Sequence, residues 1–172
     1  MAAAAAAAFL IAAGGTARAA DAGGLVQSDR DFVNKAAQGS QMEVLAGKLA
    51  AQRALNPAVK EFGEKMVSDH TAAGSRLKTL ADSKQFVLPD DVSAEEHIAL
   101  GKLESLVGTE FDKTYSKMMV DDHVQDIKEF QQATGKEKDA DVKAFAEQTL
   151  PTLRHHLMLA NRLSEDQKKS PR

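Results

Sequence analysis

Residues 85–91 read QFVLPDD and interrupt a helical pattern near the middle of the chain. The proline in this stretch cannot continue a helix, and the aspartates that follow it favour a turn. Ser93 and Glu96 then have the Ser-x-x-Glu spacing of a capping box, which predicts the start of a short helix. Gly108 predicts its end. Residues 84–108 are therefore expected to form a long connection that carries one short helix.

Apolar residues recur at helical spacing on both sides of this connection. Ser28 precedes an acidic first turn and is predicted to cap the first helix, while Asn56 before Pro57 is a cap followed by a favoured first-turn proline. Gly135 is predicted to end the third long helix. The predicted long helices span roughly residues 29–54, 57–83, 109–134 and 139–163.

These elements predict an all-α, ferritin-like four-helix bundle with a short helix in the crossover between the second and third long helices. A connection of this length suits the version of the bundle in which those two helices run parallel. The alternative is a simple up-down-up-down bundle, which does not need so long a connection. The composition agrees with a helical fold, because aromatic residues make up only 5% of the chain and Trp is absent.

The N-terminus is predicted to be a secretory signal peptide that is cleaved after Ala19. An Ala-rich apolar run is followed by small residues at positions 17 and 19, and the run is too short for a retained transmembrane helix. No Lys or Arg precedes the run, so a retained anchor and a different start residue remain alternatives. The predicted organisation is a signal peptide at 1–19, a linker at 20–27, a bundle domain at 28–164 and a charged tail at 165–172. The mature protein is expected to be periplasmic, with no membrane span.

Composition and motifs disfavour several classes of function. The 22 basic and 25 acidic residues are interspersed, so no basic stripe exists for nucleic acid. The absence of Cys excludes disulfides, thiolate metal sites and thiol catalysis. The chain also lacks a Gly-rich phosphate loop, a Gly-x-Ser-x-Gly elbow and a His-Glu-x-x-His pair, which disfavours a hydrolase.

Three histidines and one glutamate form the pattern with the most chemical content. His70 and His123 end two similar stretches, KMVSDH and KMMVDDH, and large apolar residues four and eight positions earlier place both imidazoles on apolar helix faces. His156 lies on the apolar stripe of the fourth predicted helix, whereas the neighbouring His155 is rotated away toward solvent. Glu43 lies among small residues on the first helix and needs a partner if it is buried.

Each of these four residues lies near the middle of its helix, so all four are expected near one layer of the bundle. Imidazole and carboxylate groups at Glu43, His70, His123 and His156 would be sufficient ligands for one zinc, copper or iron ion. Di-iron ferroxidase chemistry is disfavoured, because no Glu-x-x-His motif occurs. The alternative is a buried polar layer whose members satisfy one another and fix the helix register.

The chain from Ser28 to Leu163 resembles the exported bacterial family known as domain of unknown function 4142, a ferritin-like helical bundle. The resemblance implies the fold and export, and it leaves the role unassigned. The stretches that carry it are Asp31-Phe32, Gln41-Met-Glu-Val44, Lys65 to His70, Gly108 to Asp112 with Tyr115 and His123, and Leu150-Pro151 with His156-Leu157.

The leading functional hypothesis is a non-enzymatic bundle that binds a single metal ion for sequestration or envelope stress protection. The alternative is a structural or protein-interaction module of the cell envelope, with an unknown partner. An oxidoreductase that uses the bound metal is the least favoured reading. The metal, the partner and the oligomeric state are left open by the sequence.

Overall fold

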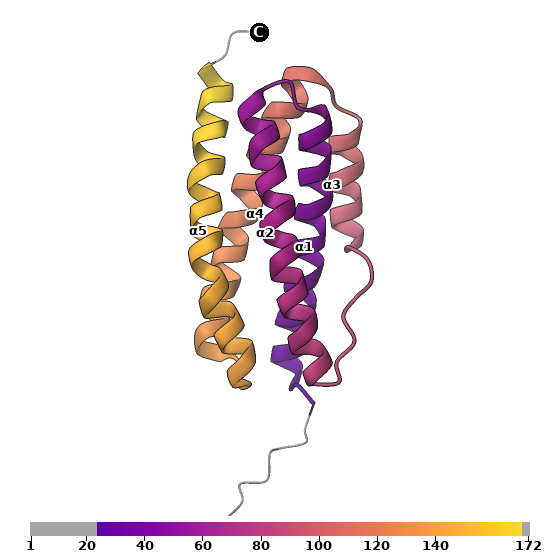
Figure 1. Cartoon of the computed structure of the whole chain (residues 1–172), viewed down its shortest axis with the longest axis vertical. Coiled ribbons are helices and arrows are strands. Elements are labelled where there is room, and N and C mark those ends of the chain that lie inside the picture. Colours follow the sequence, from indigo (N-terminus) through magenta and orange to yellow (C-terminus); the bar gives the residue numbers. More distant parts are fainter. Residues whose placement is uncertain (1–23, 170–172) are drawn as a thin grey trace, which may run out of the picture.

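The computed structural model describes residues 24–169, and all regular secondary structure in this range is helical (Figure 1). The predicted signal peptide lies outside these residues. Four long helices and one short helix confirm the predicted all-α bundle. Their bounds are α1 Gln27–Arg53, α2 Pro57–Ser83, α3 Ala94–Glu104, α4 Gly108–Lys136 and α5 Ala140–Lys169.

The long helices pair as two antiparallel hairpins, α1 with α2 and α4 with α5. After α2 the chain returns along the side of the bundle, and α3 leads it back to the end where α2 began (Figure 1). As a result α2 and α4 run in the same direction, which is the predicted ferritin-like arrangement. The short helix α3 packs against α1 and α4 and covers that side of the bundle.

Two of the predicted helix starts are confirmed by their caps. The Asn56 side chain accepts a hydrogen bond of 2.9 Å from the backbone N–H of Ala58 at the start of α2. At the start of α3, Ser93 and Glu96 form a reciprocal capping box, in which each side chain accepts from the backbone N–H of the other residue.

Three predicted helix ends are wrong by a few residues. Ser28 lies inside α1, which begins one residue earlier and has Val26 at the cap position. Gly135 does not stop α4, which continues to Lys136 with glycine in an ordinary helical conformation. The charged residues after Leu163 continue α5 to Lys169, because they are good helix formers and Gln167 among them is buried.

Two buried aspartates join one hairpin to the turn of the other. Asp112 on α4 accepts hydrogen bonds of 3.0 Å and 2.8 Å from successive backbone N–H groups of the α1–α2 turn. Asp29 on α1 accepts two bonds of 2.9 Å from the α4–α5 turn in the same way. Each carboxylate supplies acceptors that the turn itself lacks, so these contacts fix how the two hairpins dock.

The Glu137 carboxyl beside Asp29 predicts a pH dependence of stability. Burial, together with the hydrogen bond and charge of Asp29, raises the pKa of Glu137 to about 7. A carboxyl group with a raised pKa in the folded state stabilises the fold fully below its ordinary pKa of 4.5, and this contribution is lost as the pH rises to about 7. The variant Glu137→Gln keeps an N–H donor toward Asp29 at every pH. We expect Glu137→Gln to have a higher Tm than the wild type at pH 8, by roughly 3 °C, with little difference at pH 4.5.

Thermal unfolding followed by circular dichroism at both pH values measures this difference. A Tm difference that is the same at pH 4.5 and pH 8 would contradict the raised pKa of Glu137.

The apolar core is divided into two clusters along the bundle axis. One cluster, with Phe62 and Tyr115, fills the end near the α1–α2 turn, and the other, with Phe32 and Phe130, fills the end near the α4–α5 turn. Buried polar side chains lie between them. Among residues 24–169, no helix is long and apolar enough to cross a membrane.

Candidate metal site

The four predicted site residues come together in one buried layer, to which each long helix contributes one side chain. Glu43 from α1 is 2% exposed, His70 from α2 is 5% exposed, and His123 from α4 and His156 from α5 are fully buried. The ring centroid of His156 lies 5.3 Å from that of His70 and 5.3 Å from that of His123. We refer to these four residues as the polar layer.

Glu43 lies between two of the imidazoles. Its Oε2 atom is 2.8 Å from His70 Nδ1, and its Oε1 atom is 3.2 Å from His123 Nδ1, although neither oxygen has a hydrogen bond of good geometry. Burial raises the pKa of the Glu43 carboxyl, but His70 and His123 outweigh this effect and leave the pKa below its ordinary value. Glu43 is therefore a carboxylate, and it holds the Nδ1 side of both rings.

The other contacts of the layer also hold one nitrogen of each ring. His123 Nδ1 lies 2.9 Å from the backbone carbonyl oxygen of Met119 on the same helix. His156 Nε2 lies 2.7 Å from Oδ2 of Asp69, which also pairs with Lys65 at 3.0 Å. Each imidazole is thus oriented by a carboxylate or carbonyl on one side, as is usual for histidines that bind metals.

The second nitrogen of each ring is buried and has no hydrogen-bond partner among residues 24–169. These atoms are Nε2 of His70, Nε2 of His123 and Nδ1 of His156. One nitrogen from each of the three rings lies within 4.8 Å of the others. Buried polar atoms are nearly always paired, so three unpaired nitrogens in one layer need an explanation.

The charge state of the rings suits metal binding at two positions. Burial lowers the pKa of His156 to about 4 and also holds the pKa of His123 below its ordinary value. Burial would lower the pKa of His70 as well, but the Glu43 carboxylate raises it above the ordinary value. Neutral imidazole is the form that binds metals, and His70 would have to release any proton that it carries when an ion binds.

Asp69 is a part of the site that the sequence did not identify. It precedes His70 and pairs with His156 on α5, 87 residues away. The related KMMVDDH stretch gives only a partial signal, because Asp122 at the equivalent position has no such partner and its Oδ2 atom is buried without a hydrogen bond. No local pattern shows which of the two aspartates meets a histidine.

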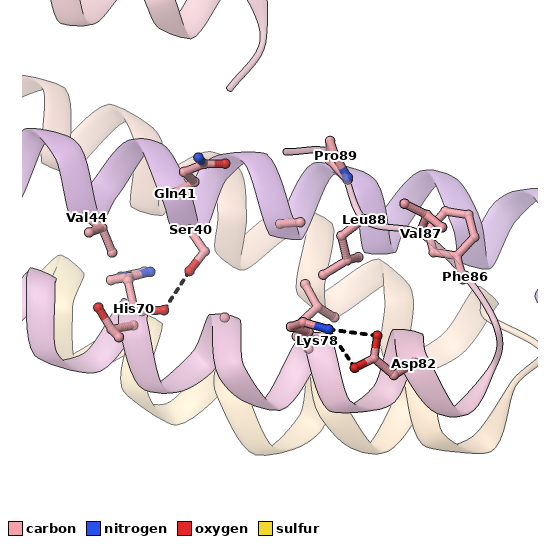
Figure 2. Close-up of a pocket in the computed structure, with 14 residues that line it drawn as sticks. Ser40, Gln41, Val44, His70, Lys78, Asp82, Phe86, Val87, Leu88 and Pro89 are labelled. Carbon is pink, nitrogen blue, oxygen red and sulfur yellow. Dashed lines mark hydrogen bonds and ion pairs between the residues drawn. The ribbon is translucent and has the colours of Figure 1, made fainter. Parts of the chain in front are cut away.

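A groove between α1 and α2 reaches the polar layer from one side (Figure 2). It has a volume of about 520 Å³, is mostly apolar, and lies beneath the crossover residues 86–89. His70 lies at one end, where its carbonyl oxygen accepts a 2.9 Å hydrogen bond from Ser40, and the Lys78–Asp82 ion pair lies toward the other. We refer to it as the α1–α2 groove.

Two solved structures share this fold. A DUF305 fragment from Deinococcus radiodurans superposes with a TM-score of 0.72 at 11% identity, over 83% of this chain and 99% of that one. A DUF305 protein from Streptomyces coelicolor, assigned as secreted, superposes with a TM-score of 0.68 at 14% identity, over 82% of this chain and 94% of that one. At these identities the likeness concerns the fold alone.

The sequence itself gives the family. No curated protein matches the chain. The sequence model of the family described as Domain of unknown function (DUF4142) matches residues 14–163, which include every helix up to the last turns of α5 and all four residues of the polar layer. The chain therefore belongs to the DUF4142 family.

Proposed function

We propose that this protein binds a single transition-metal ion through His70, His123 and His156 and sequesters it in the periplasm. The observation that carries the proposal is the set of three unpaired, buried ring nitrogens, one from each histidine. One cation at the centre of the layer would give all three atoms a partner. A layer that served only to fix helix register would be expected to satisfy its own polar atoms.

The donor set suits a borderline metal. Imidazole is a good ligand for zinc, copper and iron, and three imidazoles leave at least one coordination position for water or another ligand. Bond lengths of about 2.0 Å to zinc require ligand nitrogens about 3.3 Å apart, so the rings would close in slightly from their present separation. The three buried histidines lie on three packed helices, α2, α4 and α5, so small rotations of the rings are sufficient for this change.

Glu43 has a narrower role in this proposal than the sequence predicted. Its two oxygens face Nδ1 of His70 and Nδ1 of His123, the nitrogens opposite the unpaired ones. Asp69 stands in the same relation to His156. We therefore assign Glu43 and Asp69 to orienting the rings and balancing the charge of the ion, and the histidines to ligation.

Export supports the cellular part of the proposal. The predicted signal peptide at residues 1–19 and the absence of Cys suit an oxidising compartment. A structural neighbour from Streptomyces coelicolor is assigned as secreted. In a compartment outside the cytoplasm, a buried site with three neutral ligands would keep the ion from contact with thiols and other reductants.

Metal analysis tests the proposal directly. The mature protein is purified without a His tag or chelator, challenged separately with zinc, copper and iron, and analysed by mass spectrometry for metal content. We expect close to one ion per chain for at least one of these metals, and none in the folded variant His70→Ala/His123→Ala. His155→Ala is the matched control, because His155 is exposed on α5 next to His156 and should leave the metal content unchanged.

Circular dichroism shows whether each variant is folded. An absence of metal in the wild-type protein after all three challenges would refute the proposal and leave the polar layer as a structural element.

A further inference from the structure

A second hollow reaches the polar layer from the side of α3, and its chemistry differs from that of the α1–α2 groove. It has a volume of about 360 Å³ and lies between α1, the start of α3 and α4. Six of its lining residues are carboxylic acids, against one lysine. The acids are Glu43, Glu95, Glu96, Asp122, Asp126 and Glu129, and the lysine is Lys35. We refer to this space as the acidic hollow.

The acidic hollow leads toward the histidines through shared walls. A small internal cavity of about 20 Å³ lies on the other side of Gly39, Glu43 and Asp126, which line both spaces. His70 also lines the cavity. This volume is enough for one water-sized particle. The outer hollow and the internal cavity therefore form two successive compartments between solvent and a ligand of the proposed site.

A separate observation at the inner end points to a cation. His70 is 5% exposed, and its buried Nε2 atom has no hydrogen-bond partner within the part of the chain that the structure describes. This unpaired atom belongs to a residue that lines the internal cavity. Acidic residues alone are common on protein surfaces, but here they surround the approach to a buried nitrogen that lacks a partner.

The boundary between the two compartments includes the carboxyl group of Asp126. Asp126 has no ion-pair or hydrogen-bond partner among the described residues, and its Oδ1 atom lies 3.9 Å from where a side chain at Gly39 would begin. Burial and the nearby Glu43 charge raise the pKa of Asp126 well above its ordinary value. A cation beside this carboxyl would favour the ionised form, so Asp126 would release any proton that it carries as the ion arrives.

We propose that the acidic hollow is the route by which a divalent cation reaches the histidines, with Asp126 passing the ion from the hollow to the internal cavity. The α1–α2 groove also ends at His70, but its lining is mostly apolar and its charged pair is neutral overall. Clefts lined by one sign of charge raise the local concentration of the opposite ion and speed its association, an effect that salt weakens. This inference rests on the proposed metal site.

Association kinetics test the route. Cobalt(II) serves as the probe, because its binding to imidazole changes visible absorbance, and stopped-flow mixing gives the association rate at low and high salt. The variant Glu95→Gln/Asp126→Asn/Glu129→Gln removes three carboxyl groups from the acidic hollow and none of the proposed ligands. The control Glu61→Gln/Glu64→Gln/Glu147→Gln removes three charges from exposed positions outside the hollow.

We expect the acidic-hollow variant to bind one cobalt ion as the wild type does, with an association rate at least 5-fold lower at low salt and a weaker salt dependence. The control should keep at least half of the wild-type rate. Equal rates in the two triple variants, with stoichiometric binding in both, would overturn the route but leave the metal site standing. No cobalt binding by the wild type at any concentration tested would instead overturn the site on which the route depends.

Discussion

The variant Glu43→Leu is expected to lower the free energy of unfolding by about 3–5 kcal/mol, because it removes one partner of a buried ion pair. Glu43 Oε2 lies 2.8 Å from Nδ1 of His70, and both side chains are almost completely buried. Without the carboxylate, His70 loses the acceptor that faces this nitrogen in the described part of the chain. His123 is less affected, because its Nδ1 atom retains the Met119 carbonyl oxygen at 2.9 Å.

Urea unfolding of the metal-free protein measures this effect. In the double variant Glu43→Leu/His70→Leu, the second substitution removes the imidazole that has lost its partner. We expect its free energy of unfolding to be about 2 kcal/mol higher than that of Glu43→Leu alone. Glu64→Leu is the control, since Glu64 is exposed on α2 and its replacement should cost less than about 0.5 kcal/mol. If Glu43→Leu were as stable as the control, Glu43 would not be needed to hold His70.

The variant Gly63→Val is expected to destabilise the fold by about 3 kcal/mol, because α1 and α2 are in close contact at this glycine. A Cβ atom at Gly63 would lie 2.7 Å from the Ala50 Cβ, 2.7 Å from the Gly47 carbonyl oxygen and 3.0 Å from the Ala51 backbone nitrogen. Backbone atoms cannot rotate away as a flexible side chain can. The two helices would have to separate, and the positions of Glu43 and His70 depend on their spacing.

Gly135→Ala is the matched control for this prediction. Gly135 also lies inside a helix with an ordinary conformation, but a Cβ atom there would meet nothing within 4 Å. Alanine is a better helix former than glycine, so Gly135→Ala should raise the free energy of unfolding by up to about 1 kcal/mol. Opposite signs for the two variants in urea unfolding are expected, and a Gly63→Val protein as stable as the wild type would contradict the close approach.

The helix boundaries show which features of the fold can be predicted from residues close together in the sequence. The caps at the starts of α2 and α3 are formed by residues no more than four positions apart, so they were predictable from spacing alone. These residues are Asn56 with Pro57, and Ser93 with Glu96. Ser28 was misjudged because the start of α1 is not decided locally. The start of α1 is held by Asp29, whose acceptors are used by a turn more than 100 residues away in the sequence.

In the candidate site, too, some features follow from local sequence and others from the packing of distant residues. Helical periodicity was sufficient to place Glu43, His70, His123 and His156 on inward faces near one level, and the structure brings all four together. Periodicity gives the direction of a side chain but not the contacts of each ring atom. The pairing of Asp69 with His156, and the three nitrogens left unpaired, depend on the rotation of four helices against one another.

The sequence by itself determined the helices, the crossover that makes α2 and α4 parallel, and the burial of one acid and three histidines, because propensity, capping and periodicity act over a few residues. The tertiary structure alone decided which nitrogen of each imidazole is held and which is free. It also decided that Asp126 and Glu95, on different helices, border the same acidic hollow. Such contacts depend on distances between helices, and these are set by the packing of side chains remote in sequence, such as Gly47 against Gly63.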